Sequence, residues 1–187
     1  VFFDCHACHH PMSNVRWAPR ESHEIGPGIP RIYDANLIMM QILLQRIDPA
    51  LADTVATRSK LLHQASLQGY DAVIGAARAL KDATEGVIQR LASHEFTARD
   101  TKALLAGLLT EGLSGEYVDY AAAEQATMAA SAMLQTMVDD GMISRAKYIE
   151  LSAVLNDCYT VIEKDEEYDP RQFLVALQRL ESAVPRL

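Results

Sequence analysis

The sequence lacks any hydrophobic run long enough to cross a membrane. Its longest apolar stretch covers residues 37–40 and resumes at 42–44, whereas a transmembrane helix needs about 20 consecutive, mainly apolar residues. No signal peptide is visible either. The chain begins with Val1 rather than Met, and its first motif starts at residue 5. We therefore expect that residues upstream of Val1 were removed or belong to a larger chain.

Basic charge is also scarce. The 187 residues include 17 Lys and Arg against 25 Asp and Glu, which gives a net charge of -8. An acidic surface argues against nucleic acid or an anionic membrane as the main partner, and it allows a basic protein partner. The composition, with 49% hydrophobic and 22% charged residues, is typical of a globular protein with a sizeable core.

Cysteine is limited to three positions. Cys5 and Cys8 stand three apart, and Cys158 is far from both. This is not the pattern of a disulfide framework. Because Cys158 shares a helical spacing with Leu151 and Leu155, we expect it to be a buried thiol inside a helix.

The sequence shows no convincing strand and no internal repeat. From Asp34 onward, apolar residues recur at intervals of three and four, which is typical of helices with one buried face. The helices that we predict cover residues 32–47, 49–66, a stretch through 73–91, a stretch after 97, 117–140, 145–162 and 170–184. The sequence thus predicts an all-α bundle of about six to seven helices over residues 34–187, forming one compact unit.

Residues 1–33 differ from this bundle. They contain four of the six histidines, four of the seven prolines and the single Trp. The Gly-Pro-Gly-Ile-Pro stretch at residues 26–30 cannot continue a helix. We expect an irregular cofactor-binding segment over 1–33, followed by the helical domain.

The motif with the clearest chemistry lies in this segment. Cys5-His6-Ala7-Cys8-His9 matches C-x-x-C-H, the attachment signature of c-type haem. Two thiols at this spacing reach the two vinyl groups on one porphyrin edge, and the following His is carried under the iron. The sequence therefore predicts one haem c, covalently bound through Cys5 and Cys8, with His9 as the proximal iron ligand.

Two other interpretations of the motif were weighed. A C-x-x-C pair can be half of a zinc site, but a second ligand pair at suitable spacing is missing, and His23 would have to reach back from a distance. A thiol redox motif would need the strand-then-helix setting of thioredoxin-like proteins, which the sequence lacks.

Further histidines are candidate iron ligands. His10, and less readily His6, is placed to ligate a neighbouring haem whose own motif lies outside this chain; alternatively, both face solvent or bond haem propionates. For the sixth position of the local haem we favour His23, which follows the motif at loop distance, and then His63 on the predicted second helix.

Three residues after the motif are candidates for the haem environment. Arg16 and Arg20 can each form bidentate hydrogen bonds to a propionate. Trp17 can pack on the porphyrin edge, or it can anchor the irregular segment to the bundle.

The first 33 residues resemble a known family. Residues 5–11 (CHACHHP), Arg16-Trp17 and the Gly/Pro-rich stretch 26–30 resemble the C-terminal part of multihaem c-type cytochromes related to the cytochrome c554 group, in which a helical tail follows. The resemblance implies that Cys5 and Cys8 attach haem and that His9 ligates iron. It also implies a periplasmic or extracellular protein that passes electrons through stacked haems to other cytochrome or redox subunits. This chain has a single C-x-x-C-H motif.

These observations favour an electron carrier rather than an enzyme. The alternative is a haem enzyme or gas-binding protein with an open sixth coordination position, for which Arg20, His23 or Tyr33 could line the distal side. A third possibility is a docking role for the large helical body.

Overall fold

The computed structural model describes residues 20–24, 29 and 31–184, which form α-helices and short 3-10 helices without a β-strand. The predicted all-α fold is confirmed for these residues. The contacts divide the chain into two compact units, Val1–Glu95 and Phe96–Leu187. The boundary between these units falls between two helices that the sequence analysis had placed in one bundle.

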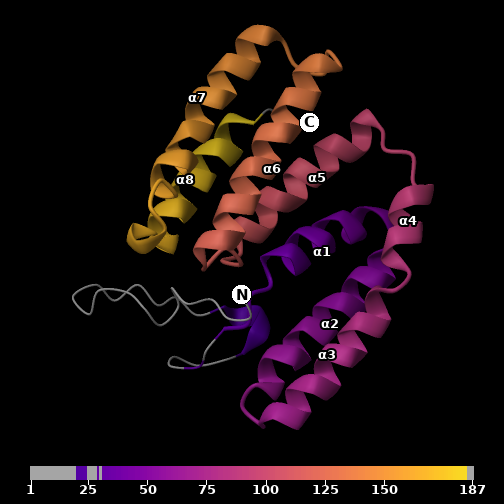
Figure 1. Ribbon diagram of the computed structural model, residues 1–187. Coiled ribbons are helices and arrows are strands. Elements are labelled where there is room, and N and C mark those ends of the chain that lie inside the picture. Colours follow the sequence, from indigo (N-terminus) through magenta and orange to yellow (C-terminus); the bar gives the residue numbers. More distant parts are fainter. Residues whose placement is uncertain (1–19, 25–28, 30, 185–187) are drawn as a thin grey trace. The chain divides into compact units, whose positions relative to one another are not determined.

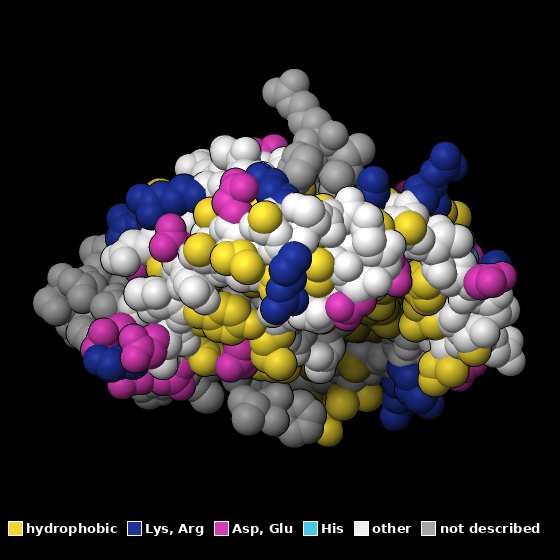
Figure 2. Space-filling view, turned by 90° about the horizontal axis from the view of Figure 1, so that it is seen from above, with side chains coloured by type: hydrophobic (Ala, Val, Ile, Leu, Met, Phe, Trp, Pro, Cys, Tyr) yellow, Lys and Arg dark blue, Asp and Glu magenta, His cyan; other side chains and the backbone are white. Residues whose placement is uncertain are grey.

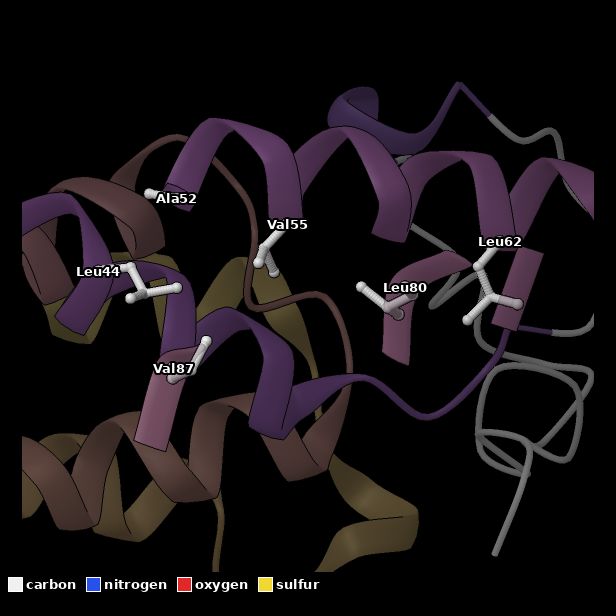
Figure 3. Packing of buried hydrophobic residues seen from close by; sticks show 6 residues of the cluster. All are labelled: Leu44, Ala52, Val55, Leu62, Leu80 and Val87. Atoms are coloured by element: carbon white, nitrogen blue, oxygen red, sulfur yellow. The ribbon is translucent and has the colours of Figure 1, made fainter. Parts of the chain in front are cut away.

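In its described part, the first unit contains four α-helices (Figure 1). They are α1 (Ala35–Ile47), α2 (Pro49–Ala65), α3 (Tyr70–Thr84) and α4 (Val87–Ser93), preceded by the 3-10 helix η2 (Glu21–His23). Helix α2 packs against both α1 and α3, and η2 also contacts α2. The core side chains drawn in Figure 3 come from all four α-helices: Leu44, Ala52, Val55, Leu62, Leu80 and Val87.

Local signals explain where α2 begins. The Asp48 carboxylate accepts a hydrogen bond from the Leu51 amide at 3.1 Å, and Pro49 occupies the first position of α2, where a missing N–H has no cost. Helix α1 begins at Ala35 rather than at residue 32 as expected, with Asp34 at the N-cap position but without a side-chain hydrogen bond to the helix.

The single helix expected through residues 73–91 is wrong, since the structure has two helices there. Helix α3 ends at Thr84 and α4 starts at Val87. Gly86 lies at the break, and glycine disfavours a helix interior by about 1 kcal/mol relative to alanine. The apolar spacing hid the break, because Leu80 and Val87 enter the same core from both sides of it.

The second unit contains the other four α-helices. They are α5 (Ala98–Leu113), α6 (Tyr120–Asp139), α7 (Arg145–Val161) and α8 (Pro170–Ala183). Neighbouring helices pack as α5 on α6, α6 on α7 and α7 on α8, and α8 also packs against α5. The carboxylate of Asp119 and the hydroxyl of Ser144 cap α6 and α7 by accepting backbone amides.

Two tyrosine hydroxyl groups form hydrogen bonds that hold the loop before α6 against this core. Tyr117 donates to the Leu108 carbonyl at 2.7 Å, and Tyr168 donates to the Tyr117 carbonyl at 2.6 Å. Both tyrosines are buried beside Phe173. These bonds give partners to two buried hydroxyl groups, which would be costly to leave unsatisfied.

No helix among residues 31–184 is long and apolar enough to cross a membrane. On the face drawn in Figure 2, acidic and basic side chains are interspersed with hydrophobic ones, and neither charge sign covers that face. The acidic side chains in this view are most crowded at the lower left, beside a basic side chain.

Gly112 tests the packing of α5 against α8. A methyl group at Gly112 would overlap the Leu177 side chain and approach the Tyr117 ring to 2.7 Å, whereas a methyl group at Gly75 meets nothing within 4 Å. Gly112→Ala should lower the free energy of unfolding by about 1–3 kcal/mol. The control Gly75→Ala on α3 should raise it by about 0.5–1 kcal/mol. Urea unfolding followed by circular dichroism measures both; equal effects would contradict this packing.

Cys158 tests the burial of α7. The structure confirms that this thiol is buried. Burial and, next, the charge of Asp157 raise the pKa of Cys158 to about 12. Because the thiolate is the reacting form, iodoacetamide at pH 8 should label Cys158 at least about 100-fold more slowly in folded than in urea-unfolded protein. Peptide mass mapping gives the rate at this residue, and rapid native labelling would show the burial to be wrong.

Candidate functional site

The haem-attachment motif lies outside the described residues. This holds for Cys5, Cys8, His9 and His10 and for Arg16 and Trp17, so their predicted roles stay predictions. Four candidate residues of the sequence analysis are described: Tyr33, which is exposed, and the three buried residues Arg20, His23 and His63. The structure brings all three together around one residue that the sequence analysis had not singled out, Asp34.

Three segments position the cluster. His23 ends the 3-10 helix η2, Asp34 is the N-cap residue of α1, and His63 lies in the last turn of α2. The η2 segment is held on α2 by two contacts near His23. Lys60 forms an ion pair of 2.7 Å with Glu24, and the Gln64 amide donates to the His23 carbonyl at 3.5 Å.

Both imidazoles approach the same carboxylate oxygen. The Nε2 atoms of His23 and of His63 each lie 3.4 Å from Oδ2 of Asp34. The two rings are 4.0 Å apart between centroids, with an interplanar angle of 65°. The exposed fractions are 4%, 3% and 4% for His23, His63 and Asp34. A carboxylate and two imidazoles are thus buried with one point of convergence.

The other carboxylate oxygen is occupied. Arg20 donates from Nη1 to Oδ1 of Asp34 at 2.8 Å, and both side chains are buried. Asp34 stands at the N-cap of α1, yet its side chain makes no hydrogen bond to that helix. Capping by an Asp side chain typically contributes about 1 kcal/mol, so the fold gives up that bond in favour of the Arg20 pair.

Burial and charge set the protonation states. Burial alone would raise the pKa of Asp34, but the adjacent His23 imidazole and the charge of Arg20 outweigh it and hold that pKa well below its usual range. Burial, followed by the charge of His23, lowers the pKa of His63 to about 3. At neutral pH the cluster therefore contains an ionised carboxylate beside a neutral His63 imidazole, whose nitrogen lone pair is available to a ligand.

Two buried polar atoms of the cluster lack hydrogen-bond partners among the described residues. They are Oδ2 of Asp34 and Nδ1 of His63. The Nε2 atoms near Oδ2 are close but do not have hydrogen-bond geometry. Buried polar groups are normally satisfied, so an unsatisfied pair in one cluster points to a bound group or water.

The geometry bears on the expected distal ligands of haem. His23 and His63 were considered as alternatives for one iron position, whereas the structure makes them neighbours. With ring centroids 4.0 Å apart, there is no space for a porphyrin between them. In this arrangement each presents its Nε2 atom to Asp34 rather than away from it.

Sequence reasoning missed two members of the site. Asp34 precedes a helix, where Asp is common as a cap. No pattern in the neighbouring sequence indicates that its side chain pairs with Arg20 instead. Ser59 lies one turn before His63 on α2, and its Oγ is 3.4 Å from Nε2 of His23. The one-turn spacing from Ser59 to His63 is a signal that they share a helix face.

The Arg20–Asp34 pair should dominate the stability of the first unit. Asp34→Asn removes the charge that Arg20 faces in a buried site, and breaking such a pair typically costs about 3–5 kcal/mol. Glu24→Gln, which removes the exposed partner of Lys60, should change stability by less than about 1 kcal/mol. Urea unfolding measures both variants, and similar losses would show that the buried pair has no special weight.

His63 should make the stability depend on pH. Its folded pKa of about 3 lies below the usual histidine value of 6.5, so between these values the unfolded chain binds a proton that the folded chain does not. Stability should therefore fall as the pH drops from about 6.5 toward 3. In EDTA, His63→Gln should flatten this dependence by up to about 1.4 kcal/mol per pH unit. If the free energy of unfolding changed with pH equally in the wild type and in His63→Gln between pH 6 and 4, the assigned role of His63 would be wrong.

Comparison with known proteins gives no match of any kind. No protein-family model, no curated protein and no solved structure matches the chain. The function is therefore argued from this chain's own residues.

Proposed function

We propose that the chain is an electron-transfer protein that carries one covalently bound haem c. The observation that carries the proposal is the C-x-x-C-H motif at residues 5–9. Cys5 and Cys8 form the two thioethers, and His9 is the axial iron ligand. Three rare residues must fall in fixed register to give this motif, which makes a chance occurrence uncommon.

The bound haem would supply a one-electron couple whose potential depends on its axial ligands and surroundings. The chain's own contribution is attachment and support. Covalent attachment retains haem even where little protein covers it, so a short segment ahead of a helical body is sufficient. The all-α described body is compatible with this arrangement, and the resemblance to cytochromes of the c554 group supports it.

The same proposal includes compartment and partners. The chain would mature in the periplasm or outside the cell, and its partners would be other cytochrome or redox subunits. His10 is the residue that we assign to a neighbouring haem in such an assembly. The net charge of -8 favours partners with a basic docking surface.

A specific observation favours a second candidate, a gas-binding or catalytic haem with an open sixth position. The two histidines proposed for that position both turn Nε2 toward Asp34. If neither leaves Asp34, neither can fill the sixth position of the iron, which is the condition for an open site.

Spectra and mass test the proposal. Protein matured in a haem-ligating compartment should have the mass of the polypeptide plus one haem, and the haem should survive denaturation and acid–organic extraction. The double variant Cys5→Ala/Cys8→Ala should lose it. Cys158→Ala is the matched control, because it removes the one remaining cysteine, and it should keep a full haem complement. A colourless wild-type chain would overturn the proposal.

Carbon monoxide separates the two candidates. Reduced protein with both axial positions filled should keep a low-spin spectrum when carbon monoxide is added. Rapid formation of a carbon monoxide complex would favour the open-site candidate over electron transfer.

A further inference from the structure

We propose that His23, Asp34 and His63 form a binding site for one Zn²⁺ ion, separate from the haem iron. The site goes beyond the proposed function and does not depend on it, since none of its residues belongs to the haem-attachment motif. Among the described residues, these three form a group of potential metal-ligating side chains whose donor atoms all lie within 4.8 Å of one another.

Two of the three distances between the donor atoms match tetrahedral zinc coordination. Zinc binds imidazole nitrogen and carboxylate oxygen at about 2.0–2.2 Å. Two ligands of a tetrahedron with such bonds lie about 3.3–3.5 Å from each other. The two distances from Oδ2 of Asp34 to the Nε2 atoms of His23 and His63 are both 3.4 Å. These contacts are long for hydrogen bonds but suit two edges of a zinc tetrahedron.

The unsatisfied oxygen is the one that the metal would take. Oδ2 of Asp34 is buried and has no hydrogen-bond partner among the described residues, whereas Oδ1 is bound by Arg20 at 2.8 Å. Arg20 thus fixes the carboxylate and leaves Oδ2 directed at the two imidazoles. A zinc ion at that point would satisfy the oxygen.

An outer contact orients His23 for this role. The Ser22 hydroxyl lies 2.8 Å from Nδ1 of His23. Histidines that bind metal through one ring nitrogen usually hydrogen-bond through the other, which fixes the ring and its tautomer. Zinc binding at Nε2 requires the tautomer in which Nδ1–H donates to the Ser22 hydroxyl and Nε2 carries the lone pair.

The donor set selects the class of metal. Two imidazoles and one carboxylate suit zinc and its transition-metal neighbours, whereas Mg²⁺ and Ca²⁺ require oxygen ligands. Three protein ligands leave a fourth position for water or a small molecule. Ser59 Oγ, 3.4 Å from Nε2 of His23, is close enough to the site to hydrogen-bond a water there.

Element-specific measurements on the full-length haem protein test this site. After dialysis against EDTA and then zinc sulfate, elemental analysis should find one zinc per chain in addition to haem iron. Zinc X-ray absorption should show only nitrogen and oxygen neighbours near 2.0 Å, including imidazole. Zinc should also raise the melting temperature.

Variants locate the ion. His23→Gln and His63→Gln should each weaken zinc binding at least tenfold, with folding checked by circular dichroism. His94→Gln is the matched control, because it changes another histidine of the same unit outside the cluster, and it should bind zinc like the wild type. The zinc X-ray absorption spectrum of the wild type identifies the types of atoms that bind the zinc, even if a variant fails to fold.

Several results would overturn the site, and they remain distinguishable from failure of the haem proposal. No zinc above background in a haem-loaded chain would refute the zinc site alone. Sulfur neighbours would place zinc at Cys5 and Cys8 and refute both proposals. A haem spectrum altered by His63→Gln, without zinc in the wild type, would assign that histidine to iron instead.

Discussion

The buried carboxylate of Asp34 is the interaction on which the first unit of this protein depends. Its two oxygens are used differently, one by Arg20 and the other by the imidazoles of His23 and His63. An isolated charge in such a place would be costly to bury. The chain offsets that cost by bringing η2, the start of α1 and the end of α2 to one point, so the cluster also determines how residues 20–24 lie against the helices.

Local signals predicted much of the helical body. Helices α2 and α8 begin at Pro49 and Pro170, the first residues of the ranges expected for them, and the Asp before each Pro accepts a hydrogen bond from a backbone amide of its helix. These interactions join residues that are close in sequence, so they can be predicted from sequence patterns. The break between α3 and α4 was missed, because Leu80 and Val87 keep a helical spacing across it.

The candidate site was predictable only in part. His23 and His63 were selected as candidates because imidazole is a common iron ligand. Their proximity depends on the packing of η2 on α2, which also brings His23 to Ser59, 36 residues further along the chain. Asp34 resembled an ordinary N-cap, and nothing local showed that its carboxylate turns toward Arg20. The division into two units at Glu95 likewise depends on contacts between residues far apart in sequence, which the spacing of apolar residues does not reveal.

The absence of a side-chain cap on α1 has a consequence for how site and helix influence each other. The Asp34 carboxylate can serve either the backbone amides at the start of α1 or the cluster, and in this structure it serves the cluster. The helix terminus and the site therefore compete for the same two oxygens. A change that breaks the cluster would free the carboxylate to rotate and cap the first turn of α1. That turn should therefore fray less when the site is broken than when it is intact.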